Sequence, residues 1–193
     1  MKILICGLGA IGSNLTARLV ADLKGEHAIT LLDYDTVEER NVQAGTQFYT
    51  PDQIGMLKTE ALQFNLYKWY QRRTTVRNEN ILDVSALDVD DYDLVIDCFD
   101  NTRARNRLFS FGSRNETEVL HVGFSDNFTF AIEWNDNYVV PTDINGLDIC
   151  ELPGAAAFVN IVSSMGAMVA EEYVLKKNKM EVTGGKFVHT LIK

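Results

Sequence analysis

The sequence has little cysteine and proline and no long apolar run. Its 193 residues include three prolines and three cysteines, Cys6, Cys98 and Cys150. The cysteines are too far apart for a CxxC pair, so we expect neither a disulfide scaffold nor a four-thiolate zinc site. No apolar run reaches the roughly 18 residues that span a bilayer, and the N-terminus lacks a signal-peptide pattern. These absences favour a cytoplasmic protein that does not enter a membrane.

Basic residues are also scarce: 18 Lys and Arg against 27 Asp and Glu give a formal charge of −9. Such a balance disfavours a broad basic face, so we expect no nucleic-acid partner. The single aromatic and basic cluster, at 69–73, is typical of a helix end that packs on a core. The three histidines are too scattered to predict a metal cluster, and we expect His121 to be a neutral, hydrogen-bonded residue on a strand.

The N-terminal segment has the pattern of a strand, a helix and a second strand. The apolar run Lys2–Cys6 ends at a glycine, apolar residues spaced by four follow from Ile11 to Leu23, and Ala28–Leu32 is again continuously apolar. Continuously apolar strands are typical of parallel sheets covered on both faces. We therefore predict an α/β fold: a Rossmann-like, doubly wound, mostly parallel sheet with helices on both faces.

The rest of the chain continues this alternation as one domain, residues 1–193, with no linker or repeat. Residues 36–51 are polar and without a period, so we expect a long loop there. Further strands are expected at 74–77, 94–98, 119–124, 129–134 and 186–192, and helices at 57–69, 101–114 and 155–175, the last of them buried.

A glycine pattern, Gly7, Gly9 and Gly12, lies between the first expected strand and helix. Gly7 permits a tight turn, Gly9 lets a phosphate approach the backbone, and Gly12 lets the helix pack closely on the sheet. The N-terminus of the helix offers free N–H groups to that phosphate. Asp33 directly follows the second expected strand, at the distance from the glycines where a carboxylate can accept hydrogen bonds from ribose. The pattern predicts nucleotide binding; the alternative is a tight turn without a ligand.

Three further segments, in order, carry a more specific resemblance. They are Asp33–Asn41 (DYDTVEERN), Ile54–Lys58 (IGMLK) and Asp97–Asn101 (DCFDN), the last followed by Arg105. In these motifs the sequence resembles the ThiF/MoeB/HesA family, the bacterial relatives of ubiquitin-activating enzymes. The resemblance extends from residue 2 to about residue 176.

The resemblance implies a carboxylate adenylyltransferase that uses ATP and Mg²⁺. The carboxylate attacks the α-phosphorus of ATP and expels pyrophosphate, so the site must neutralise growing phosphate charge, a task that suits Lys58. By the resemblance, Asp100 holds Mg²⁺, Asp33 takes the ribose and Asn41 reaches the phosphates. Asp35, in the same motif as Asp33, either contributes to nucleotide binding or forms a turn. The implied partner is the C-terminal glycine of a small sulfur-carrier or ubiquitin-like protein.

Several of these residues have simpler explanations. Lys58 could be a surface lysine on a helix, and Asp100 could cap the helix after it. For Asp97 we expect a strand-end residue that either caps the next helix or bonds loop amides. We expect Arg103, Arg105 and Arg107 to lie largely on a solvated helix face, although Arg105 matches the family motif and could brace Asp100.

Cys150 is a third candidate, since relatives often carry a cysteine shortly before the glycine that precedes the apolar helix. In some of them it accepts the carrier protein, which requires a thiolate. The acidic neighbours Asp148 and Glu151 work against that, so an inert loop thiol is the alternative. Cys6 and Cys98 are expected to be small core residues.

The sequence departs from the family in three ways. An N-terminal arm with an arginine and the zinc cysteines are missing, and Ala44 and Gly45 stand where the family has arginine and glutamine. Either Arg40, Arg103 or a side chain of a partner replaces the charge, or the protein binds nucleotide without adenylating well. What remains is predicted to be a minimal adenylation module.

Three rival functions follow. The carboxylate could belong to a small molecule in cofactor biosynthesis, or the protein could be a non-catalytic nucleotide sensor or scaffold. An NAD-dependent oxidoreductase would need a second nucleotide-binding half for nicotinamide. The family generally forms homodimers, and the expected helix at 155–175, apolar on more than one face, could contribute to such a contact.

Overall fold

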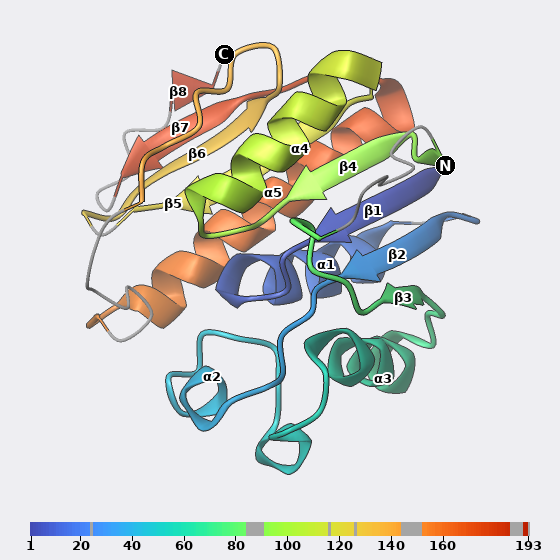
Figure 1. Ribbon diagram of the computed structural model, residues 1–193, viewed down its shortest axis with the longest axis vertical. Coiled ribbons are helices and arrows are strands. Elements are labelled where there is room, and N and C mark those ends of the chain that lie inside the picture. The colour runs from blue at the N-terminus through green and yellow to red at the C-terminus, as the bar shows by residue number, and fades with distance from the viewer. Residues whose placement is uncertain are drawn as a thin grey trace.

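The fold is a single mixed sheet with helices on both faces (Figure 1). The computed structural model describes residues 1–193 except 24, 84–90, 116, 126, 144–151, 186–190 and 193. In that part of the chain the sheet has eight strands in the order β3-β2-β1-β4-β5-β6-β7-β8. The strands β3, β2, β1, β4 and β5 are parallel to one another. Strands β6, β7 and β8 extend the sheet, and each is antiparallel to the strand before it. This confirms the predicted mostly parallel, doubly wound arrangement.

The inner strands β1, β2 and β4 are short and mostly apolar, as expected for a sheet covered on both faces, whereas the edge strand β3 is partly exposed. The bounds of all strands are β1 Lys2–Cys6, β2 Ala28–Leu32, β3 Thr75–Arg77, β4 Leu94–Asp97, β5 Val119–Phe124, β6 Thr129–Trp134, β7 Val182–Gly185 and β8 Leu191–Ile192.

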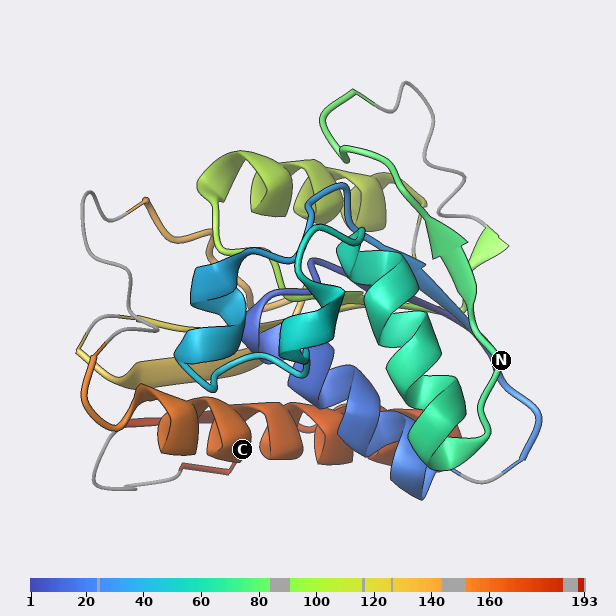
Figure 2. The same ribbon diagram turned by 90° about the horizontal axis from the view of Figure 1, so that it is seen from below.

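The helices divide unevenly between the two faces (Figure 2). Helices α1, α3 and α5 bury their apolar residues in the larger core, and α4 packs on the opposite face with a smaller core. Gly166 of α5 allows close packing, because a Cβ there would lie 2.8 Å from Leu15 of α1. The helices are α1 Ala10–Asp22, α2 Glu39–Gln43, α3 Lys58–Tyr70, α4 Thr102–Asn115 and α5 Ala155–Lys176, with a 3-10 turn, η1, at Pro51–Gln53.

Three expectations are corrected. The predicted loop at 36–51 contains α2, which a capping box between Glu38 and Asn41 starts and which is too short to show a helical period. Strand β7 lies just before the predicted final strand and was missed because its sequence, VTGG, is not an apolar run. Within the predicted range 186–192 the structure describes only β8. The helix at 155–175 is buried on one side only, since Ile161 and Met168 are exposed.

The carboxyl ends of β1 and β4 lie side by side at the centre of the sheet. The chain leaves β1 for α1 on one face and β4 for α4 on the other, which makes this the switch point of the fold. Ligands of open α/β sheets bind at such points. Among the described residues, no helix combines the length and apolar character that crossing a membrane requires.

Candidate functional site

The glycine turn joins β1 to α1 at the switch point. Gly7 has a φ of +80°, a conformation that favours glycine. A Cβ on Gly12 would lie 1.8 Å from the carbonyl oxygen of Gly7, so no larger residue fits there, whereas Gly9 has open space around its Cα. Helix α1 begins at Ala10 without a side-chain cap. Within the described part of the chain no side chain caps its first N–H groups, which suits an anion that approaches over Gly9.

Asp33 ties the end of β2 to this turn. Its Oδ2 accepts a hydrogen bond of 2.6 Å from the N–H of Leu8, and its Oδ1 accepts one of 2.9 Å from the N–H of Asp35. Burial raises the pKa of the Asp33 carboxyl, and the charge of Lys58 and the two N–H groups offset part of that effect. Each oxygen keeps a further lone pair with which it could accept a ribose hydroxyl.

Lys58 is the first residue of α3, and its amine points back toward the end of β2. Its side chain is 10% exposed, and Nζ lies 3.0 Å from Oδ2 of Asp35, whose side chain is 48% exposed. The backbone N–H of Lys58 also donates to the carbonyl of Asp35. A lysine free on the surface is therefore excluded: Lys58 is held beside the carboxyl end of β2, with Asp35 as its partner.

Tyr49 is a site residue that the sequence reasoning missed. Its buried hydroxyl donates to the carbonyl of Leu8 at 2.7 Å and lies 3.5 Å from the carbonyl of Lys58. Burial raises the pKa of this phenol. Tyr49 thus links the glycine turn to the start of α3. An aromatic residue in a mostly polar segment gives no local signal of such a role.

Asn41 is buried in α2, and its Oδ1 accepts a hydrogen bond of 2.8 Å from the N–H of Glu38. The amide oxygen therefore holds α2 in place, and a phosphate would have to use the amide nitrogen. The loop after α2 is fastened to α1, because Asn14 donates to the carbonyl of Thr46 and Ser13 accepts from the N–H of Phe48.

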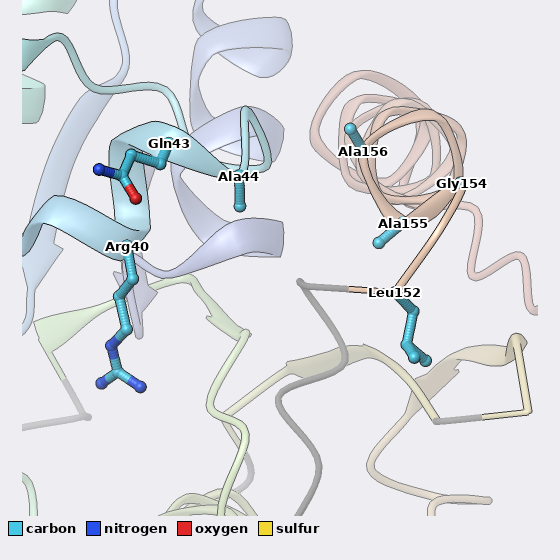
Figure 3. Close-up of a pocket in the computed structure, with 7 residues that line it drawn as sticks. All are labelled: Arg40, Gln43, Ala44, Leu152, Gly154, Ala155 and Ala156. Carbon is cyan, nitrogen blue, oxygen red and sulfur yellow. The ribbon is translucent and has the colours of Figure 1, made fainter.

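A pocket of about 390 Å³ lies between α2 and the start of α5 (Figure 3). Arg40 and Ala44, one helical turn apart, are on its α2 wall. Ala44 occupies the position where the family pattern has arginine. In the close-up the Arg40 side chain extends away from Ala44, and its Nε lies 2.6 Å from Oε2 of Glu38. The lining residues are Arg40, Gln43, Ala44, Leu152, Gly154, Ala155 and Ala156.

Asp97 and Asp100 differ sharply in their surroundings. Asp97 is buried, and its Oδ1 accepts a hydrogen bond of 3.0 Å from the N–H of Phe99, which confirms that it is a strand-end residue bonding a loop amide. Asp100 is exposed. The side chain of Asn101, not that of Asp100, caps α4 by accepting from the N–H of Ala104 at 2.9 Å.

Arg105 and His121 lie behind the Asp100 loop. Arg105 Nε donates to the carbonyl of Phe99, so its contact is with the residue before Asp100. His121 is 2% exposed, and its ring nitrogens lie 2.7 Å from Oδ2 of Asp97 and 3.0 Å from Oδ1 of Asn135. The expectation that this histidine is hydrogen-bonded is confirmed.

The structure describes two of the three cysteines. Cys6 and Cys98 are buried at the ends of β1 and β4, and burial raises the pKa of both thiols. They are core residues, as expected. Cys150 lies outside the described residues, and its reactivity stays a prediction.

The structure brings the first group of predicted residues into direct contact: the glycine turn, Asp33, Asp35 and Lys58. The Asp100 loop meets the same turn from the other side, since a Cβ on Gly7 would lie 2.9 Å from the backbone nitrogen of Phe99. Contacts of the described residues thus converge on the glycine turn from β2 and from β4.

These features define a Rossmann-like α/β domain with a glycine turn at its switch point. The chain belongs to the ThiF family, whose profile matches residues 1–177. It is 32% identical over 109 residues to the molybdopterin-synthase adenylyltransferase of Escherichia coli, a match that covers 55% of this chain and 43% of that protein. It is 30% identical over 153 residues to the ubiquitin-like modifier-activating enzyme 5 of Drosophila virilis, covering 72% of this chain and 36% of that protein.

Solved structures show the same fold. The crystal structure of E. coli MccB with ATP has a TM-score of 0.75 and 18% sequence identity; the match covers all of this chain and 62% of that one. The crystal structure of PaaA has a TM-score of 0.74 and 14% identity, with all of this chain and 72% of that one covered. The chain spans less than half the length of the two curated relatives.

Proposed function

We propose that this protein binds ATP and transfers its adenylyl group to a carboxylate. A carboxylate oxygen attacks the α-phosphorus, the bond to the bridging oxygen of pyrophosphate breaks, and an acyl adenylate and pyrophosphate result. The observation that carries the proposal is the buried Lys58 amine, which Asp35 holds beside the Asp33 carboxylate and the glycine turn. The naming of relatives as adenylyltransferases supports it.

Each part of the site has a separate task in this reaction. The free N–H groups of α1 and the open space at Gly9 accept phosphate oxygens. Asp33 accepts the ribose hydroxyls, and its hydrogen bond from Leu8 keeps it in line with the turn. Lys58 stabilises the negative charge that grows on the leaving pyrophosphate, an interaction that strengthens in the transition state.

Asp100 is the proposed ligand of Mg²⁺. Its carboxylate is exposed at the carboxyl end of β4, and no role as helix cap occupies it. One carboxylate together with phosphate oxygens is a donor set that suits this ion. When bound there, Mg²⁺ would neutralise phosphate charge alongside Lys58.

The proposed acyl substrate is the C-terminal glycine of a small ubiquitin-like or sulfur-carrier protein. One relative is named a ubiquitin-like modifier-activating enzyme, and MccB is seen in a crystal structure with a form of MccA. In this chain small residues line the pocket between α2 and α5, Ala44, Gly154, Ala155 and Ala156, which suits an unbranched substrate tail. We further propose a homodimer, for which the exposed apolar residues of α5 would supply part of the contact.

A pocket of about 390 Å³ would also hold a small-molecule carboxylate, which is the second candidate. The two are separated by supplying ATP and labelled pyrophosphate with, in turn, a small protein ending in Gly-Gly, a short peptide of the same C-terminal sequence, and a set of small carboxylic acids. Exchange with the protein or peptide alone supports the carrier; exchange with acids alone supports the small molecule.

Lys58→Ala tests the adenylation itself. We expect it to lower the pyrophosphate exchange rate by about a hundredfold or more, as the loss of a charge-stabilising group does. Lys68→Ala is the matched control, because Lys68 lies on the same helix at its exposed end. No exchange with any carboxylate, together with tight ATP binding, would overturn the enzymatic proposal and favour a nucleotide sensor.

A further inference from the structure

Phe99, the residue immediately before Asp100, has both of its backbone polar groups held by side chains. Its N–H donates to Oδ1 of Asp97 at 3.0 Å, and its carbonyl accepts from Nε of Arg105 at 2.6 Å. Such charge-assisted hydrogen bonds are among the stronger ones in proteins. The backbone that leads into Asp100 is therefore fixed from both sides.

The two side chains that hold Phe99 are themselves connected. Oδ2 of Asp97 lies 2.7 Å from Nδ1 of His121, and NH1 of Arg105 donates to the hydroxyl of Tyr138 at 3.0 Å. The rings of His121 and Tyr138 are stacked, with centroids 3.6 Å apart and planes 8° from parallel. Phe99, Asp97, His121, Tyr138 and Arg105 thus form a closed ring of contacts, here called the Phe99 clamp.

The clamp is tightly enclosed. Asp97, His121 and Tyr138 are buried, and burial raises the pKa of Tyr138 to about 12, so its hydroxyl stays protonated at neutral pH. The guanidinium of Arg105 lies against Gly123 of β5, where a Cβ would be 2.6 Å from NH2. A larger residue at 123 would displace Arg105.

The segment that follows Tyr138 is also bonded to the start of α4. Thr102, at the start of α4, donates from its hydroxyl to the carbonyl of Pro141 at 2.7 Å and from its N–H to Oδ1 of Asp143 at 2.5 Å. This hydrogen-bonding lowers the pKa of the Asp143 carboxyl. The chain from Tyr138 to Asp143 is therefore fastened at both ends around the loop that carries Asp100.

We infer that Tyr138 and His121 are positioning residues, which act through Arg105 and Asp97 to fix the backbone at Asp100. They do not touch the substrate; they hold Asp100 at the place where the metal and phosphates of the proposed reaction meet. The inference deepens the proposed function and rests on it for its effect on catalysis. The clamp's effect on the backbone does not depend on that function.

The first test uses Tyr138→Phe, which keeps the stacked ring and removes only the hydroxyl. Tyr173→Phe is the matched control, since Tyr173 is a buried tyrosine on α5 that packs on Trp134, on the opposite face from α4. We expect hydrogen–deuterium exchange of the Phe99 and Asp100 amides, without any ligand, to become about tenfold faster in Tyr138→Phe and to stay unchanged in the control.

The second measurement is the Mg²⁺ dependence of pyrophosphate exchange. For Tyr138→Phe we expect kcat to fall about tenfold and the Mg²⁺ concentration for half-maximal rate to rise, with the KM for ATP at saturating Mg²⁺ changed less than about twofold. If Tyr138 acts through Arg105, the effects of Tyr138→Phe and Arg105→Lys will be non-additive in the double variant.

The outcomes separate the two proposals. Unchanged amide exchange in Tyr138→Phe, or additive effects in the double variant, would overturn the positioning role. Faster amide exchange in a protein that shows no pyrophosphate exchange with any carboxylate would support the clamp and reject the adenylation. A loss of kcat without any change in Mg²⁺ dependence would show that the clamp does not act on Asp100.

Discussion

The carboxylate of Asp33 accepts a hydrogen bond of 2.6 Å from the backbone N–H of Leu8, which places the end of β2 in direct contact with the glycine turn after β1. The position of Asp33 relative to Gly12 in the sequence already predicted an acid near a ribose. The contact adds a second task, because the same carboxylate shapes the turn. Substitution of Asp33 will therefore change both the turn and the binding of a nucleotide.

Asp33 gives a prediction about pH. Burial raises its folded-state pKa above 3.8, so in the window between 3.8 and the folded value the native state binds more protons than the unfolded state. The contribution of Asp33 to the unfolding free energy must then grow as the pH falls through that window. We expect the stability of the wild type relative to Asp33→Asn to increase on acidification, measured by urea unfolding at pH 7 and at pH 4. A constant difference would show that the carboxyl does not titrate in this way.

We expect alanine substitutions at Gly12 and Gly9 to have opposite effects on stability and on ATP binding. Gly12→Ala would put a Cβ 1.8 Å from the carbonyl of Gly7, and we expect it to reduce the unfolding free energy by about 2 kcal/mol or more. Gly9→Ala meets open space and should leave thermal unfolding almost unchanged, while it weakens ATP binding because the methyl group stands where a phosphate approaches. Calorimetric melting and ATP titration of both variants check this. Equal losses of stability would contradict it.

Arg40 is the predicted substitute for the arginine that the family pattern has at Ala44. Both residues line the same pocket, whereas Arg103, the other candidate, lies on α4 and is not among the residues that line it. We expect Arg40→Ala to slow pyrophosphate exchange about tenfold or more and Arg103→Ala to have little effect. Arg40→Ala combined with Ala44→Arg should recover part of the rate. The reverse order of the two single variants would assign the role to Arg103.

The thiols should differ in reactivity. Burial raises the pKa of Cys6 and Cys98, so at pH 8 neither has an appreciable thiolate fraction or access to reagent. We expect iodoacetamide to leave both unmodified in the native protein and to label both in urea, as mapped by mass spectrometry. The same experiment reports on Cys150: rapid native labelling would support the predicted thioester role, and slow labelling the inert thiol.

Sequence reasoning worked best where the signal is local. The strand at 2–6, the stripe of α1 and the glycine spacing are each set by neighbouring residues, and the structure has them at the predicted places. The motif singled out Lys58 as a candidate, but it did not predict that the side chain is buried. The burial accompanies an ion pair with Asp35, which lies 23 residues earlier in the sequence. Tyr138 was missed altogether. Its partner His121 is distant in the sequence and meets it only after β5 and β6 pair.

It was harder to predict which side chains are buried than to predict where helices and strands lie. The small and apolar residues of α5 predicted a buried helix, yet Ile161, Met168 and Leu175 are exposed at regular intervals along it. Composition alone does not tell which side of such a helix meets the sheet. Helix α2 starts at a capping box inside a polar stretch. The helix is too short for its sequence to show a helical period, so it was not predicted.

The close fit among Gly7, Gly12 and Cys98 has a consequence for protein engineering. A Cβ on Gly12 would collide with the Gly7 carbonyl and lie 3.2 Å from the Cβ of Cys98, so these three positions have to be transplanted as one unit. Asp35 and Lys58 are joined to this unit through Asp33, which accepts hydrogen bonds from Asp35 and from Leu8 of the turn. A designer who wants to move the nucleotide site to another scaffold therefore has to carry this ion pair along with the turn.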